Sequence, residues 1–157
     1  MVFLGFPLGK GENESVYYSQ ISHGTIAYII SPPRAIEGAD PKSFRILPLH
    51  NAEGADDVET TAAVYAADAH SVFLYGERVP FADPNTFEAY LLTDPLGRRA
   101  PYGRDNNHVY TFNDIIKGAD AATFEVLDSP VKCERYGVEY FCLARDKNGL
   151  ILGFSVE

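Results

Sequence analysis

Short runs of β-branched and aromatic residues recur along the chain, separated by turns rich in Asp and Asn. The runs VYAAD (64–68), PYGRD (101–105) and YFCLARD (140–146) each predict a strand that enters a tight turn. The turns DAHS, DNNH and DKNG lead into the runs VFLY, VYTF and LILGF. Asp and Asn suit such turns because their side chains hydrogen-bond the local backbone. The pattern predicts a mainly β protein of repeated antiparallel hairpin units.

A second motif, Asp-Pro-x-Ser/Thr-Phe or a close variant of it, lies between the hairpins. It occurs as ADPKSF (39–44), ADPNTF (82–87) and ADAATF (119–124). The pattern is typical of the first turn of a helix, where Asp at the N-cap accepts hydrogen bonds from backbone N–H groups. Proline is tolerated just after the cap because its missing N–H has no helical partner. We therefore predict short Asp-capped helical turns between strands, with Asp40, Asp83 and Asp120 as structural caps.

The hairpins and caps together form a longer repeat. Asp83 follows Asp68 by 15 residues, and Asp120 follows Asp105 by the same interval. Repetition with a period of 20 to 50 residues indicates stacked supersecondary units. The prediction is a single domain over 1–157, made of an N-terminal arm (1–15), repeat units at about 16–49, 62–92 and 99–128, a truncated fourth unit (138–157), and an acidic loop (50–61).

The paired motif resembles a known family. YGRDNNHVY…IKGADAATFEVL (102–127) and ARDKNGLIL (144–152) are similar to the repeats of the bacterial DKNYY family. The resemblance extends over about residues 20–154 and is weakest in the first unit, where Ser22 replaces the turn Asp. It implies a repeat architecture, a bacterial origin and a connection with toxin–immunity systems. It brings no catalytic residues.

The distribution of charge is the most informative feature of the composition. The chain has a formal net charge of −9, and the stretch from Glu37 to Asp94 holds eleven acidic residues against three basic ones. Four of these acids are packed into HNAEGADDVE (50–59): Glu53, Asp56, Asp57 and Glu59. Binding to a nucleic-acid backbone requires Lys and Arg, whereas an acidic surface accelerates encounter with a basic protein. We predict these four residues as partner-binding, with an ordinary solvated loop as the alternative.

Enzyme motifs and metal-ligand spacings are missing from the sequence. No His-x-x-His, nucleophile elbow or phosphate-binding glycine loop occurs, and DKNG lacks the later ligands of a calcium loop. We therefore expect no catalysis, no cofactor and no metal. No apolar run is long enough for a membrane helix, and the N-terminus lacks the basic region of a signal peptide. The expected location is the cytoplasm, without membrane contact.

Cys133 and Cys142 are the only two cysteines. They lie in VKCERYGVEYFCLARD, which predicts a hairpin that turns near Tyr136 and Gly137. Such a hairpin would bring the thiols close enough for a disulfide or redox pair. Because cytoplasmic cysteines are normally reduced, we expect packed free thiols.

Two functions remain open from the sequence. The first is an immunity-type protein that binds and inhibits a cognate basic bacterial toxin enzyme, such as a nuclease. The second is a non-catalytic repeat module with a structural or adaptor role in protein–protein interaction.

Overall fold

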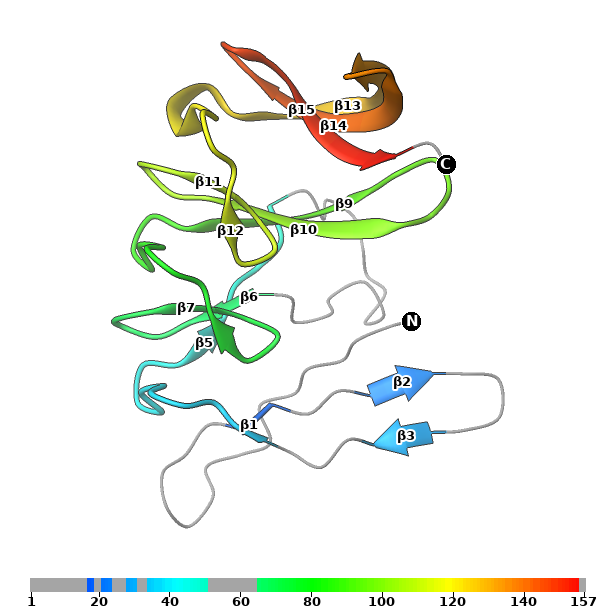
Figure 1. Ribbon diagram of the computed structural model, residues 1–157. Coiled ribbons are helices and arrows are strands. Elements are labelled where there is room, and N and C mark those ends of the chain that lie inside the picture. The colour runs from blue at the N-terminus through cyan, green and yellow to red at the C-terminus, as the bar shows by residue number, and fades with distance from the viewer. Residues whose placement is uncertain (1–16, 19–20, 24–27, 31–33, 51–64, 156–157) are drawn as a thin grey trace.

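Figure 1 shows a computed structural model of the chain, which describes residues 17–18, 21–23, 28–30, 34–50 and 65–155. The described residues form β-strands and a single three-residue 3-10 helix, η1 (Ala121–Thr123). The prediction of a mainly β protein is therefore confirmed. Within these residues, no helix has the length and apolar character needed to cross a membrane.

The strands form antiparallel sheets that follow one another in chain order (Figure 1). Two sheets have two strands: β1 (Tyr17–Tyr18) with β4 (Arg34–Ala35), and β2 (Ile21–His23) with β3 (Tyr28–Ile30). One four-stranded sheet has the order β5 (Arg45–Ile46), β6 (Tyr65–Ala67), β7 (Val72–Leu74) and β8 (Glu77–Arg78). The next has the order β12 (Asp114–Ile115), β11 (Val109–Thr111), β10 (Arg99–Arg104) and β9 (Glu88–Thr93). The last has the order β13 (Glu125–Arg135), β14 (Val138–Asp146) and β15 (Gly149–Ser155).

The three larger sheets share one plan. A connection that carries the cap motif enters each sheet and continues as its first strand, β5, β9 or β13. This strand pairs with the next one along the chain, as in the register of Glu88 opposite Arg104. The second and third strands are joined by the turn that begins with Asp68, Asp105 or Asp146. In the repeat read from the sequence, the strand after each cap ends a unit. In the structure this strand joins the next sheet as its first strand, so each sheet is displaced by one strand from the repeat unit.

The sheets stack through their side chains. Residues along β9 alternate between two clusters: Ala89 packs with the β5–β8 sheet, whereas Tyr90 and Leu92 pack toward the β13–β15 sheet. Both faces of the β9–β12 sheet are consequently covered, with Tyr110 on one face and Val109 on the other, each fully buried. Alternation with a period of two is what a strand covered on both faces requires.

The Phe that ends the second and third cap motifs enters this core, whereas Phe44 is partly buried against Ile36 and Phe73. The Phe87 ring centroid lies 5.0 Å from that of Tyr65 and 5.6 Å from that of Tyr110. Room for the ring depends on Gly103, where an added Cβ would lie 2.2 Å from Cζ of Phe87. The corresponding position is alanine in the neighbouring units, at Ala66 and Ala144. The close approach of the ring to the strand is therefore particular to the Phe87 unit.

The cap motifs form shorter turns than a helix. Only the third is helical, as η1, and the first two are single turns closed by Ser43 N–H to Asp40 C=O (3.3 Å) and Thr86 N–H to Asp83 C=O (3.2 Å). The expectation of an α-helical first turn is wrong for the described residues. These i→i+3 bonds are of the 3-10 type, and the chain becomes a strand directly after the Phe, so no second turn can form.

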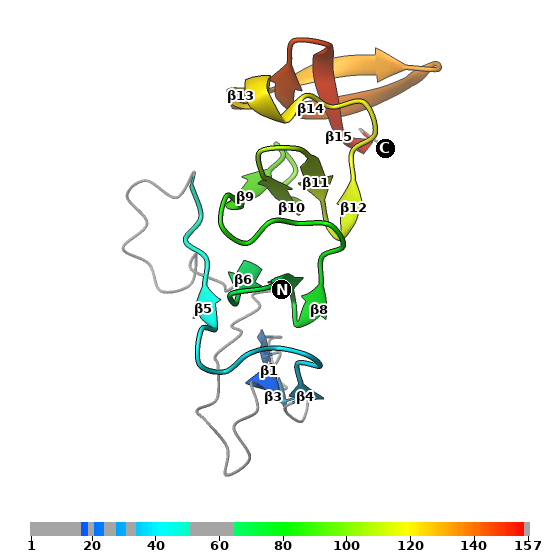
Figure 2. The ribbon, with the colours of Figure 1, turned by 90° about the vertical axis from the view of Figure 1, so that its left-hand side faces the viewer.

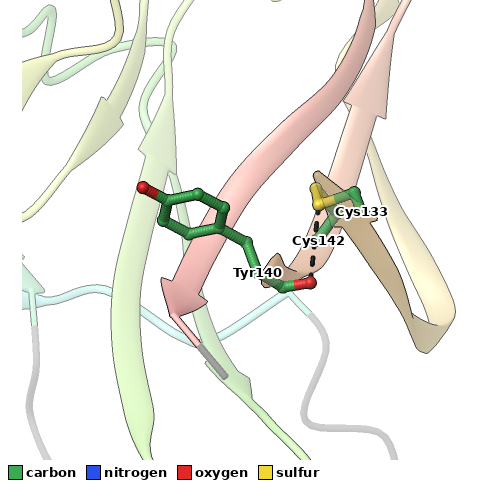
Figure 3. Close-up of a disulfide and its surroundings, with 3 residues drawn as sticks. All are labelled: Cys133, Tyr140 and Cys142. Carbon is green, nitrogen blue, oxygen red and sulfur yellow. Dashed lines mark hydrogen bonds between the residues drawn. A yellow bond between two sulfur atoms is a disulfide. The ribbon is translucent and has the colours of Figure 1, made fainter. Parts of the chain in front are cut away.

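The two cysteines are joined, so the expectation of free thiols is wrong. Cys133 and Cys142 form a disulfide with Cα atoms 6.0 Å apart (Figure 3). In the β13–β14 register Cys133 lies opposite Tyr140 and Cys142 opposite Val131, so the cysteines sit diagonally across the hairpin. The sulfur of Cys133 also lies 3.6 Å from the carbonyl oxygen of Tyr140 (Figure 3). The hairpin at Tyr136 and Gly137 thus brings the cysteines to the Cα separation usual for disulfides.

Candidate functional site

The three predicted cap residues accept hydrogen bonds inside their own turns. Asp120 is the N-cap of η1, and its Oδ1 accepts bonds from the Thr123 N–H (3.1 Å) and hydroxyl (2.7 Å). The Asp83 carboxylate accepts bonds from the Asn85 N–H (3.0 Å) and the Thr86 hydroxyl (3.0 Å). The Asp40 carboxylate has the same arrangement, with donors from the Lys42 N–H and the Ser43 hydroxyl. The hydroxyl bond from Ser or Thr three residues on is common to all three caps, whereas the N–H donor lies two residues on in the first two units and three residues on in the third.

Each cap also contacts the hairpin turn of its own sheet, through a pair of bonds that we call a latch. In the first bond, the N–H of Asp40, Asp83 or Asp120 donates to Oδ2 of Asp68, Asp105 or Asp146, at 2.8, 3.1 and 2.6 Å. In the second bond, the N–H that follows the turn Asp donates to the cap Ser or Thr hydroxyl, at 3.0, 3.4 and 3.0 Å. Figure 1 shows the cap turns along one edge of the stack, beside these hairpin turns. Figure 2 views the same edge.

The turn Asp of each latch holds its own turn together as well. Asp105 Oδ1 accepts bonds from the N–H groups of Asn107 (2.8 Å) and His108 (2.7 Å), and Oδ2 accepts one from the Tyr110 hydroxyl (2.9 Å). Burial acts to raise the pKa of Asp105, but these donors and the Asp83 N–H lower it by more, so the net pKa is lowered. Carboxylates engaged in this way hold the backbone, and their oxygens have little capacity left for a metal ion or a proton-transfer role.

The pKa values of the cap residues are lowered for the same reason. The Ser43 hydroxyl and then the Lys42 N–H lower the pKa of Asp40. The Asn85 N–H and then the Thr86 hydroxyl lower that of Asp83. All of these donors favour the charged carboxylate. Both groups are therefore ionised, and neither is suited to act as a general acid.

The predicted partner-binding residues Glu53, Asp56, Asp57 and Glu59 lie outside the described residues. The described residues do fix the two points between which this acidic segment runs. On one side, Leu49 forms a parallel bridge with Ala89, and the His50 N–H donates to the Ala89 carbonyl at 2.8 Å. On the other side, Tyr65 is fully buried, and its hydroxyl donates to the Phe112 carbonyl at 3.2 Å. The segment thus joins two anchored positions on neighbouring sheets.

A polar cluster lies beside the first anchor. The Glu88 carboxylate accepts bonds from Arg104 Nε and the Tyr90 hydroxyl, both at 2.6 Å, and the His50 ring centroid lies 5.6 Å from that of Tyr90. The hydrogen bond from Arg104 lowers the pKa of Glu88, whereas burial and then Glu88 raise the pKa of Tyr90 to about 12. Near neutral pH the cluster therefore holds a carboxylate–guanidinium pair and a neutral phenol. It resembles a fixed polar contact more than an acid–base device.

No metal centre is found in the parts of the chain that the structure describes. Nowhere in them do three His, Cys, Asp or Glu side chains gather closely enough to hold an ion. His108 lies 3.8 Å from the Asp105 carboxylate, which already accepts bonds from the backbone.

Sequence reasoning missed a set of aromatic residues with unusual backbone, three of which are exposed. The four non-glycine residues with positive φ among the described residues are all aromatic: Tyr75, Phe81, Phe112 and Tyr136. Phe81 is 83% exposed and Tyr136 is 92% exposed. Phe81 stands where the other two cap motifs have Gly38 and Gly118, both with positive φ. Aligning the three motifs would have revealed this substitution, but exposure could not be seen without the fold.

Comparisons with protein-family models, with curated proteins and with solved structures give no match to this chain. The family resemblance of the repeat motifs therefore stays a prediction.

Proposed function

We propose that this chain is an immunity-type protein that binds and inhibits a cognate basic bacterial toxin enzyme, with nucleases as the first class to test. The observation that carries the proposal is the acidic segment at 50–59, which runs between the anchored residues His50 and Tyr65. The resemblance of the repeats to the DKNYY family supports the same function.

Inhibition would follow from competition for the toxin's basic groups. A nuclease binds its substrate through Lys and Arg that contact phosphates. In the proposed complex, Glu53, Asp56, Asp57 and Glu59 meet these cations in place of the phosphates. Complementary charge accelerates association, while the affinity comes mainly from buried aromatic contacts. We place this protein in the bacterial cytoplasm, where a toxin that enters the cell would meet it.

A structural or adaptor role is the second candidate. The latches favour it, because their bonds tie each cap motif to a hairpin turn 22 to 28 residues away. A module built in this way presents a fixed edge for other proteins without inhibiting any of them.

Co-expression with the product of the neighbouring reading frame tests the proposal. The wild-type protein should protect cells from that product and co-purify with it at equal stoichiometry. The variant Asp56→Lys/Asp57→Lys should associate more slowly and protect less well, and its association rate should depend less steeply on salt. The control Glu37→Lys/Asp114→Lys makes the same charge change at two exposed positions and should protect as the wild type does. Failure of the wild type to bind or protect would leave the adaptor role.

A further inference from the structure

The end of the β13–β14 hairpin projects from the β13–β15 sheet. Beyond the disulfide, the residues from Glu134 to Glu139 are all exposed. In Figure 2 this end extends past the other strands of its sheet. The turn consists of Tyr136 (φ 54°) and Gly137 (φ 78°), the conformation of a tight type I′ hairpin turn. We call residues 131–140 the tip.

One face of the tip is mainly apolar. Because side chains alternate across a strand, the β13–β14 register places Val131, Cys133, Val138 and Tyr140 on the same face, with Arg135 as its one charged residue. Val131 is 40% exposed and Val138 is 44% exposed. Tyr136 at the turn is the most exposed large hydrophobic residue described, and the Arg135 guanidinium carbon lies 5.3 Å from its ring centroid. The tip thus presents an aromatic ring and two aliphatic side chains to solvent.

The opposite face of the tip carries uneven charge. Glu134 lies directly opposite Glu139 in the register, and like charges in this position are destabilising. Lys132 pairs with Glu139 at 3.4 Å, whereas Arg135 belongs to the first face and lies over Tyr136. Among the described residues Glu134 has no ion-pair partner, so this face of the tip carries one unpaired negative charge. A cationic side chain on a partner would relieve the repulsion between the two carboxylates.

The tip is also held in one shape. A two-residue turn closes the hairpin, and the Cys133–Cys142 disulfide crosses it nearby. An element that is ordered before binding loses less entropy when it docks. A projecting end can bury its side chains only within a concave surface.

We propose that the tip is the docking element of this protein, and that Tyr136 inserts into a concave, apolar site bordered by basic residues on a protein partner. The basic character of that partner rests on the proposed function as well as on Glu134, whereas the insertion of Tyr136 rests on the tip alone. An aromatic side chain at the centre of an interface is a typical hot spot.

Two variants separate docking from folding. Tyr136→Asn places the residue preferred at this position of a type I′ turn, so the thermal midpoint should stay equal or rise. Affinity should nevertheless fall by about 30-fold or more, the loss typical of a tyrosine hot spot. The matched control is Leu96→Ala, which removes an apolar side chain that is 61% exposed in a different loop and should change affinity less than twofold.

The partner is found and tested with a photoreactive side chain. Benzoylphenylalanine replaces Tyr136 in one full-length variant and Leu96 in another, and each is irradiated in the bacterium that produces the protein. The proposal expects a heterologous adduct specific to position 136, mapped to a basic concave site. The purified partner should then bind Tyr136→Asn about 30-fold more weakly than it binds the wild type.

Several results overturn the proposal. In the cross-linking experiment, these are the absence of an adduct specific to position 136, an adduct with a second copy of this chain, or an adduct mapped to a flat or acidic surface. In the binding experiment, the contrary result is full affinity in Tyr136→Asn. Failure of the proposed function gives a different result, since a Tyr136-dependent complex would then form without protecting cells from a toxin. Protection that survives Tyr136→Asn, conversely, would reject the docking role and leave the proposed function standing.

Discussion

Replacing Asp105 with alanine tests how much a latch and the turn that it holds contribute to stability. The Asp105 side chain is fully buried and accepts four hydrogen bonds, from the N–H groups of Asp83, Asn107 and His108 and from the hydroxyl of Tyr110. Asn107 is exposed and His108 is half-buried, so their N–H groups can bond to water once the carboxylate is removed. Tyr110 is 0% exposed, so its hydroxyl cannot. A buried donor left without a partner costs about 1–3 kcal/mol. With the part-buried Asp83 N–H included, we expect a loss of about 3 kcal/mol from a total stability of roughly 5–15 kcal/mol.

The assay is urea unfolding, supported by a thermal scan. A loss of about 3 kcal/mol corresponds to a fall in the midpoint of roughly 6–12 °C for a chain of this size. Tyr110→Phe is the matched control, since it removes the buried donor but leaves the carboxylate its three N–H partners. The double variant Asp105→Ala/Tyr110→Phe should lose less stability than the sum of the single variants, because the orphaned hydroxyl is gone. A loss below about 1 kcal/mol in Asp105→Ala, or strict additivity in the double variant, would refute the reasoning.

Three further predictions follow from the same contacts. Gly103→Ala should lower the free energy of unfolding in urea by about 1–3 kcal/mol, because its Cβ would overlap the Phe87 ring. Adding Phe87→Leu should restore part of the loss, and stability equal to the wild type in Gly103→Ala would contradict the contact. Cys133→Ser/Cys142→Ser should fold but lose about 2–3 kcal/mol, the entropy of a loop closed over nine residues, and unfolded, unreduced wild type should resist alkylation. Free thiols in protein taken from cells would mean that the disulfide does not form there. Acid should destabilise the fold, because the pKa values of Asp83 and Asp105 are lowered in the folded state. The contribution of these two carboxylates to stability is fully present above the ordinary carboxyl pKa of about 4, and it is lost as the pH falls through the lowered values. A thermal midpoint that is unchanged below pH 4 would argue against this linkage.

The cysteine pair shows where sequence reasoning about compartment and reasoning about geometry diverge. The absence of a recognisable signal peptide led to the expectation of reduced thiols, although the same segment predicted the hairpin at Tyr136 and Gly137. The observed register brings Cys133 and Cys142 within 6.0 Å. Disulfides persist mainly in oxidising environments, so the state of these thiols in the cell also tests the proposed cytoplasmic location.

The local features of this protein could be predicted from its residues without the fold. Turn residues, cap motifs and β-rich runs are set by interactions within a few residues, so the strands around Asp68, Asp105 and Asp146 and the turn at Tyr136 could be predicted. The acidic segment was also visible, because charge density needs no fold.

Which of these features contact one another depends on the fold as a whole. Each latch joins residues 22 to 28 positions apart, and no local pattern specifies that the cap entering a sheet lies beside the second hairpin turn of that sheet. The need for Gly103 beneath Phe87, the burial of Tyr110 and the exposure of Tyr136 likewise depend on which sheet faces cover one another. Such contacts depend on strand register and on the stacking of whole sheets, where a displacement of one residue turns every side chain to the opposite face.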